Sequence, residues 1–287
     1  EVENGGGIFR RIEVTDVDKK LQPLPIGVQS FEMLRRDGLV YVDKTARLQE
    51  LILNVRRCFL SRPRRFGKSL TLSTLDAMFR GKTELFKGLA AEAWVAEQHP
   101  APVLRLDMSA MDADDVPLLK QSLEDALSRS AASFEIELTS RTLGGKLQDL
   151  IIGLFRLGGP VVVLIDEYDK PILDRIGDLE AAEAMRMVLR GFYAVLKSCD
   201  ESLRFVMLTG ISRFSKMGLF SAMNNLRDIS MSEGFGDIVG YTQVELEDSF
   251  SEWILAAAGR MNMAQPELLE QVKAYYDGFC FDGTTRL

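Results

Sequence analysis

The residues with the clearest capacity for chemistry end the segment from Cys58 to Ser69, which closes with Gly67, Lys68 and Ser69. An apolar strand pattern leads into this segment and a helical pattern follows it. That is the arrangement of a phosphate-binding loop, in which backbone N–H groups surround the phosphates, the lysine reaches the β- and γ-phosphates and the hydroxyl coordinates Mg²⁺. The general pattern G-x-x-x-x-G-K-[ST] has glycine where this chain has Arg62. We therefore predict a phosphate site whose second half must lie elsewhere in the chain.

Two adjacent carboxylates, Asp166 and Glu167, follow the clearest strand pattern of the chain at residues 161–165. In phosphate-loop enzymes a carboxylate at the end of a neighbouring strand holds Mg²⁺ directly or through water. We predict that Asp166 and Ser69 are metal ligands and that Glu167 polarises a water near the γ-phosphate. Taken alone, most such Asp-Glu pairs are solvated acids, and the apolar strand and the upstream loop favour the catalytic role here.

A further strand pattern ends at Thr209, with Ser212 and Arg213 just beyond it. Thr209 or Ser212 is a candidate for orienting the attacking water or sensing the γ-phosphate. Arg213 is a candidate for neutralising charge that develops during phosphoryl transfer, in its own site or in a neighbour's. The alternative is equally open: Thr209 satisfies a strand end and Arg213 pairs with a surface acid.

Positive charge gathers at the loop in a chain whose net charge is −7. Residues 56–68 contain six Lys or Arg and no Asp or Glu, and although such a run is usually a solvated face, this one coincides with the loop. Arg64 and Arg65 are predicted to add positive potential, whereas Arg62 is predicted to be structural and to hold the turn before Pro63. The predicted phosphate-binding residues are Arg64, Arg65, Phe66, Gly67, Lys68, Ser69 and Leu70.

Composition excludes several other classes of protein. With 287 residues, 46% of them hydrophobic, the chain has ample material for one large α/β domain, alone or with a small appendage. Cys58, Cys199 and Cys280 are far apart and His99 is the one histidine, which excludes a disulfide framework, a Cys-rich zinc site and a His triad. This cysteine usage fits the cytoplasm. No apolar run approaches the ~20 residues of a membrane span, so we expect no membrane partner.

The elements that must position these residues alternate between strands and helices. Strand patterns occur at residues 39–42, 103–107, 161–165 and 204–209, and helical patterns at 30–36, 45–54, 68–80, 116–131, 143–157 and 181–198. The stretch 161–165 is continuously apolar, as in central parallel strands covered on both faces. The alternation predicts an α/β fold with a central parallel sheet.

Beyond residue 210 the pattern becomes mostly helical. Thr242 and Glu245 form a capping box that opens a helix to about Ala258, and Pro266 stands at the start of another. We therefore expect three regions: a peripheral segment at residues 1–22, a core at 23–218 and a mostly helical subdomain at 219–287.

The separated motifs, taken in order, resemble the AAA-ATPase-like family found mostly in bacteria. They lie at residues 61–70, 164–171 and 209–216, with shorter ones at 25–27, 41–45, 224–229, 240–245 and 276–279. The resemblance covers roughly residues 24–283. The form Arg-Pro-Arg-Arg-Phe-Gly-Lys-Ser is usual in that family, so Arg62 departs from the general phosphate loop and not from its own relatives.

The resemblance implies a P-loop NTPase fold of the additional-strand, AAA-like type, with the Thr209 strand between the strand that bears Asp166 and the strand that leads to Arg62. It also implies ATP and Mg²⁺ as ligands. Family members commonly continue into a PD-(D/E)XK nuclease-like region, and this sequence ends before one, so we expect a fragment. Any contact with nucleic acid is then expected through an attached domain.

Three functions remain open. The first is an ATPase whose hydrolysis drives or gates a conformational change, including control of a nuclease-like effector, and the second is a slowly hydrolysing ATP switch built from the same residues. The third is a nucleic-acid-binding or scaffold module with an inactive nucleotide site, which the run Arg56–Arg65 suggests and the net charge of −7 opposes. A small-molecule kinase is disfavoured because the Asp-Glu pair suits water activation. The sequence leaves homo-oligomer formation open.

Overall fold

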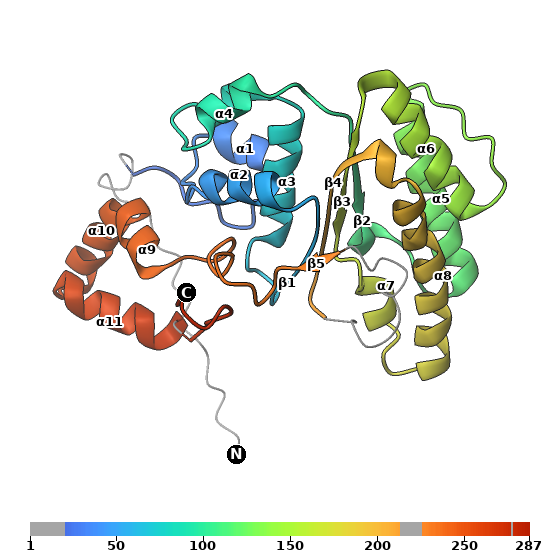
Figure 1. Ribbon diagram of the computed structural model, residues 1–287. Helices are drawn as coiled ribbons and strands as arrows, with labels where there is room; N and C mark the ends of the chain where they lie inside the picture. The colour runs from blue at the N-terminus through green and yellow to red at the C-terminus, as the bar shows by residue number, and fades with distance from the viewer. Residues whose placement is uncertain (1–20, 213–225, 277) are drawn as a thin grey trace, which may run out of the picture.

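The computed structural model describes residues 21–212, 226–276 and 278–287. Within these ranges the centre of the molecule is a parallel sheet of five strands in the order β2-β3-β4-β1-β5 (Figure 1). The strands are β1 Arg57–Ser61, β2 Val103–Asp107, β3 Val161–Asp166, β4 Leu203–Gly210 and β5 Arg227–Asp228. The strand β4 lies between β3 and β1, which confirms the additional-strand arrangement of a P-loop NTPase.

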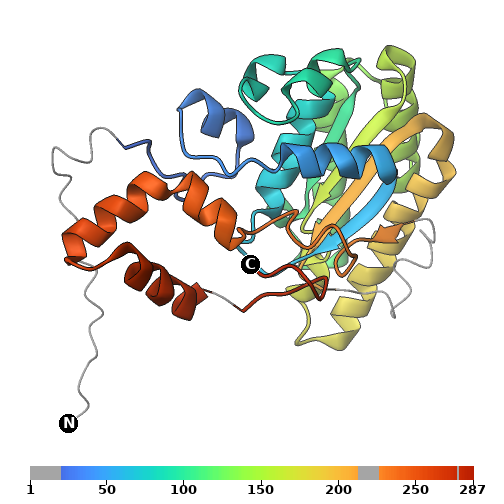
Figure 2. The same ribbon diagram turned by 60° about the vertical axis from the view of Figure 1, so that its left-hand side comes forward.

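Helices cover both faces of the sheet (Figures 1 and 2). One face carries α5 Val116–Ser133, α6 Leu143–Gly158, α7 Lys170–Leu173 and α8 Leu179–Ser198. The other carries α1 Phe31–Arg36, α2 Thr45–Asn54, α3 Lys68–Phe79 and α4 Glu92–Glu97. Short 3₁₀ turns lie at η2 Thr83–Phe86, η3 Met108–Ala110 and η4 Asp200–Ser202.

The strand β3 shows why both faces must be covered. All six of its residues are buried, and successive side chains of a strand point to opposite faces. Val161, Val163 and Ile165 pack in the core under α5, α6 and α8, whereas Val162 and Leu164 pack in the core under α3. The continuous apolar pattern of this strand therefore predicted its central position correctly.

Three helices stand beside the sheet: α9 Gln243–Ser249, α10 Ser251–Met261 and α11 Gln265–Tyr276 (orange to red in Figure 1). We call them the lid helices. The capping box at Thr242 and Glu245 is present as predicted. The prediction of a single helix that reaches Ala258 is wrong, because Phe250 leaves the helical conformation at φ −117° and ψ 16° and separates α9 from α10.

Two further expectations differ from the structure. The stretch at residues 39–42 is not a strand: Leu39 N–H donates to Leu34 and Val40 N–H donates to Pro23, so this backbone is paired with coil and with α1. Conversely, β5 lies inside the range 219–287 that was expected to be mostly helical, and it pairs with β1. The boundary at residue 218 stays a prediction.

None of the helices in the described ranges has the length and apolar character needed to cross a membrane.

Candidate functional site

The phosphate loop, residues 61–69, connects β1 to α3. Gly67 takes φ +91° at the position before the first helical residue, a backbone conformation that favours glycine. Arg65 also has a positive φ, +66°, and such non-glycine residues concentrate at functional sites. No side chain caps α3, so the first backbone N–H groups of this helix are free to bind an anion.

Lys68 lies across the inside of this loop. Its side chain is buried, and Nζ donates to the carbonyls of Arg62 and Pro63, each at 3.0 Å. Burial lowers the pKa of the Lys68 ammonium, while the nearby carboxylates of Asp166 and Glu167 oppose that shift. The loop that the sequence predicted and the two carboxylates at the end of β3, Asp166 and Glu167, therefore come together in one site.

The carboxylate of Asp166 is held by two hydrogen bonds. Thr209 Oγ1 donates to Asp166 Oδ1 at 2.5 Å, and Glu167 N–H donates to the same oxygen at 3.1 Å. Thr209 is fully buried, so in this arrangement its hydroxyl positions Asp166 and does not face the open part of the site. The order β3-β4-β1 brings this about, because the ends of parallel strands meet at one edge of the sheet.

Glu167 is the carboxylate that faces the open cavity. Its backbone has φ +47°, an uncommon conformation for a residue with a side chain. Burial is the largest cause of its raised pKa, and the negative charges of Asp166 and Asp107 add to it, against Lys68 and Arg64. A carboxylate with a raised pKa beside a phosphate loop is suited to act as a general base.

Asp169, for which the sequence predicted no role, organises the loop after β4. Asp169 is buried, and Oδ2 accepts hydrogen bonds from the N–H groups of Ile211 (3.0 Å) and Ser212 (2.6 Å). Tyr168 OH donates to the carbonyl of Ser212 at 2.9 Å. A Cβ on Gly210 would lie 2.4 Å from the Tyr168 ring, so glycine is required there. The available signal was the run Asp-Glu-Tyr-Asp at 166–169. Arg213 lies outside the described residues.

A cavity of about 1200 Å³ opens beside the phosphate loop. All seven predicted phosphate-binding residues, 64–70, line it, together with Glu167, whereas Asp166 and Thr209 are buried and do not. Its charged lining is positive, with one carboxylate, Glu167, against Arg64, Arg65, Lys68, Lys273 and Arg286, and with Lys44, whose charge is paired with Glu245. Its apolar lining includes Ile26, Val28, Val40, Val42, Ile238, Val239, Leu246 and Leu287. A ligand with an anionic end and an apolar end matches this lining.

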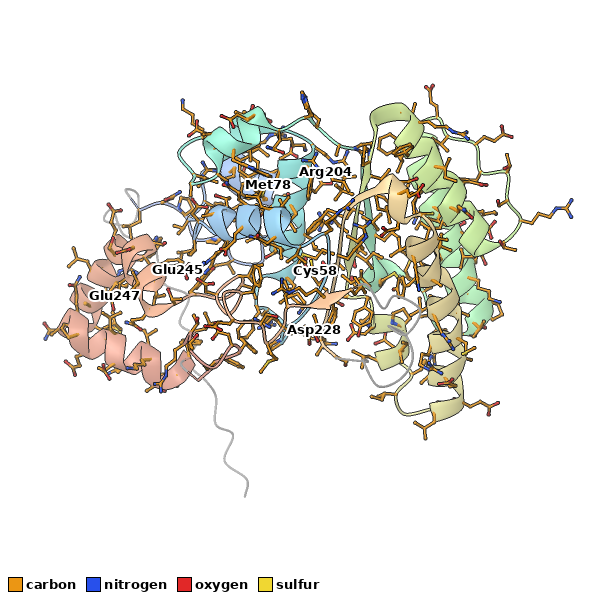
Figure 3. All side chains as sticks on the ribbon, viewed as in Figure 1. Cys58, Met78, Arg204, Asp228, Glu245 and Glu247 are labelled. Atoms are coloured by element: carbon orange, nitrogen blue, oxygen red, sulfur yellow. The ribbon has the colours of Figure 1, made fainter. Side chains whose placement is uncertain are left out.

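An ion pair joins the lid helices to the start of α2, on the side of the cavity formed by that helix. Lys44 Nζ contacts both carboxylate oxygens of Glu245, at 2.5 and 2.6 Å, and both side chains are largely buried. Glu245 also accepts from the N–H of Thr242 in the capping box. In Figure 3 Glu245 lies on the side of the lid helices nearest to α2, and Glu247 lies farther out. This pair could not be predicted from the sequence, because its partners are 201 residues apart.

Arg62 is structural, as predicted. Its side chain is buried, and its guanidinium donates to the carbonyls of Ser230 at 2.6 Å and Phe235 at 3.3 Å. Burial lowers its pKa to about 10, with opposing contributions from Asp228 and Asp282. Arg62 therefore joins the phosphate loop to the segment that follows β5, and it does not line the cavity.

The donor set at the site fits Mg²⁺ shared with a phosphate ligand. Ser69 offers a hydroxyl and Asp166 a carboxylate, and hard oxygen donors of this kind suit Mg²⁺, which usually keeps waters and substrate phosphates as its other ligands. No three His, Cys, Asp or Glu side chains of the described residues gather to hold a metal by themselves. Ser69 and Asp166 are therefore the oxygen donors that this site offers to such a metal.

Comparison with known proteins gives a family match. The model of the family described as "Predicted AAA-ATPase" matches residues 25–220. A relative from Azotobacter chroococcum mcd 1, described as an uncharacterized protein in the vnfD 5' region, is 38% identical over 266 residues. That match covers 91% of this chain and 49% of the relative, so the chain spans about half the length of the curated relative. The Aeropyrum pernix ORC1 protein, solved in complex with DNA, is a distant structural match. Its TM-score is 0.39 and its identity 12%, over 77% of this chain and 52% of that one.

Proposed function

Because this chain belongs to the AAA-ATPase-like family, we propose that it binds ATP with Mg²⁺ and hydrolyses the β–γ anhydride bond. The observation that carries this proposal is the meeting, in one positively lined cavity, of Lys68, the free N-terminus of α3 and Glu167. Each part has a separate task in phosphoryl transfer, and the family match supports nucleotide binding independently.

We assign the roles as follows. The backbone of residues 64–69 and the ammonium of Lys68 bind the phosphates, with Arg64 and Arg65 adding positive potential. Ser69 and Asp166 would hold Mg²⁺, which supplies charge neutralisation at the phosphates. Glu167 takes a proton from the attacking water, and Thr209 keeps Asp166 oriented through its 2.5 Å hydrogen bond. Arg213 is proposed to neutralise charge that develops during phosphoryl transfer, in its own site or in a neighbour's.

The basic run at residues 56–68 favours the ATPase over a nucleic-acid-binding scaffold. Arg57, Arg62 and Lys68 are buried. Arg57 pairs with Asp200 at 2.8 Å and Arg62 binds backbone carbonyls. Half of the run is therefore committed inside the fold and is not available as a surface for a phosphate backbone.

We further propose that hydrolysis moves the lid helices relative to the sheet. The ion pair Lys44–Glu245 and the hydrogen bond from Gly240 N–H to Phe66 O, at 3.2 Å, connect the lid side of the cavity to α2 and to the phosphate loop. In the whole protein this movement would control an attached effector of nuclease type, and a homo-oligomer is compatible with it. The attached effector rests on the family resemblance, whereas the sequence leaves the homo-oligomer open.

The direct test is ATP binding and phosphate release by the purified chain with Mg²⁺. Lys68→Ala should abolish measurable ATP binding, because the ammonium and its charge are lost from the loop. Arg129→Gln is a matched control, since it removes one positive charge from an exposed position on α5 and should leave binding unchanged. Equal ATP binding by wild type and Lys68→Ala would refute the assignment.

A further inference from the structure

The residues at the end of the described chain, 279–287, form a defined hairpin. Leu287 N–H donates to Phe279 O at 2.9 Å, and Cys280 and Arg286 form an antiparallel bridge. Asp282 closes the turn by accepting from the N–H groups of Thr284 and Thr285 and from the Thr285 hydroxyl. These hydrogen bonds hold the pKa of Asp282 well below its usual range. We call residues 279–287 the C-terminal hairpin.

The C-terminal hairpin packs against the phosphate loop through aromatic rings. Phe66, at the tip of the loop, meets the ring of Phe279 edge-on, with centroids 4.7 Å apart at 77°, and that of Phe281 at 5.7 Å and 84°. Such edge-to-face pairs are favourable and directional. In both views the hairpin lies between the lid helices and β1 (Figures 1 and 2).

Arg62 makes the second contact, and it does so from the position where a general phosphate loop has glycine. The Arg62 guanidinium carbon lies 3.9 Å from the centroid of the Phe281 ring. Its Nε is buried without a hydrogen-bond partner, so the ring covers a cation that is not fully satisfied by carbonyls. On the same side, a Cβ on Gly236 would lie 2.2 Å from Asp282 Oδ2. The hairpin therefore fits closely against the loop and against the segment after β5.

The other side of the hairpin faces the cavity. Phe279, Arg286 and Leu287 line it together with Lys68 and Ser69. The Arg286 side chain is exposed, and across the described ranges no carboxylate forms an ion pair with it. An arginine with unused donors on the wall of a positively lined cavity is suited to a phosphate or another polyanionic group.

From this geometry we propose that the C-terminal hairpin contributes a ligand-binding residue and a positioning residue to the nucleotide site. Arg286 binds the phosphate chain of the ligand, and Phe281 is a positioning residue that sets the shape of the phosphate loop through Arg62. The inference deepens the proposed function and rests on it. It explains why Arg62 stands in place of glycine: the loop is shaped by its contact with a distant segment and needs less of its own flexibility.

The test compares ATP affinity and hydrogen exchange in wild type and variants of the full chain. Arg286→Gln should weaken ATP binding by about tenfold or more, the effect of one hydrogen bond to a charged group. Arg129→Gln, with the same change in net charge, should bind as wild type does. Phe281→Ala should also weaken ATP binding, whereas Phe281→Tyr, which keeps the ring, should bind ATP as wild type does. In wild type, a non-hydrolysable ATP analogue should slow amide exchange across residues 279–287.

The outcomes separate the two proposals. If wild type binds ATP and Arg286→Gln binds it as tightly as Arg129→Gln does, the hairpin inference is wrong and the proposed function stands. Unchanged exchange at residues 279–287 with the analogue bound would likewise overturn the inference. If wild type binds no ATP, both the hairpin inference and the proposed function are wrong. Because Arg286 is exposed, its variant tests the idea even where Phe281→Ala fails to fold.

Discussion

Replacing Arg62 by glycine, the residue that the general phosphate-loop pattern has at this position, should lower the free energy of unfolding of this protein. In Arg62→Gly the carbonyls of Ser230 and Phe235 lose the donors that lie 2.6 and 3.3 Å away, and Phe281 loses the guanidinium stacked on its ring. A buried carbonyl left without a partner costs about 1–3 kcal/mol, and glycine adds about 0.5–1 kcal/mol of backbone entropy.

Part of this loss is offset, because the variant no longer buries a charge. The pKa of Arg62, lowered by burial to about 10, means that the folded protein holds this proton less tightly than the unfolded chain does. Folding therefore carries a cost for the charged group at neutral pH, and this cost begins to fall only as the pH rises through 10 toward the higher pKa of arginine in the unfolded chain. We expect a net loss of about 2–4 kcal/mol in the free energy of unfolding.

Urea unfolding of wild type, Arg62→Gly and Arg64→Gly measures this directly. Arg64 is in the same loop but exposed and lines the cavity, so Arg64→Gly should cost less than about 1 kcal/mol. The two arginines thus separate a buried structural role from a surface charge. An Arg62→Gly protein as stable as wild type, or one that binds ATP more tightly, would refute the reasoning.

Two further changes probe the carboxylates. Asp107→Asn removes a negative charge that raises the pKa of Glu167; since Glu167 must be ionised to act as a base, the acid limb of the ATPase pH profile should move to lower pH, and an unchanged limb would contradict the assignment. Thr209→Val removes the hydroxyl that donates to Asp166 at 2.5 Å and should cost about 1.5–3 kcal/mol in urea unfolding, whereas Thr209→Ser should cost clearly less because it keeps the hydrogen bond.

The fold could be predicted from sequence wherever a local pattern was long. The helices α2 and α3 and the continuously apolar strand β3 each leave a clear pattern in the sequence, and the structure confirms them. The strand β5 has only two residues and leaves no pattern. The stretch at residues 39–42 consists of residues that favour strands, and its burial alternates as in a strand, with Val40 and Val42 buried, but its backbone hydrogen bonds go to coil and to α1.

The candidate site divides in the same way. The phosphate loop and the pair Asp166-Glu167 are contiguous in sequence, so residue types and spacing were enough to identify them. Lys44 and Glu245 depend on tertiary contacts across the chain, as does the hairpin that packs on Arg62. Neither spacing nor composition reports contacts of that kind. The sequence shows that Arg62 is unusual, because a charged residue stands where the general phosphate loop has glycine. Its partners could not be predicted, because they lie far away in the chain.

Glu167 is the residue that we propose activates water for ATP hydrolysis at this site. Single-turnover hydrolysis and ATP binding, measured side by side with Mg²⁺ for wild type and Glu167→Gln, test it most directly. We predict that Glu167→Gln binds ATP as tightly as wild type and hydrolyses it about 10²–10⁴-fold more slowly, the usual contribution of a general base. Hydrolysis at the wild-type rate by Glu167→Gln, with ATP bound, would contradict it.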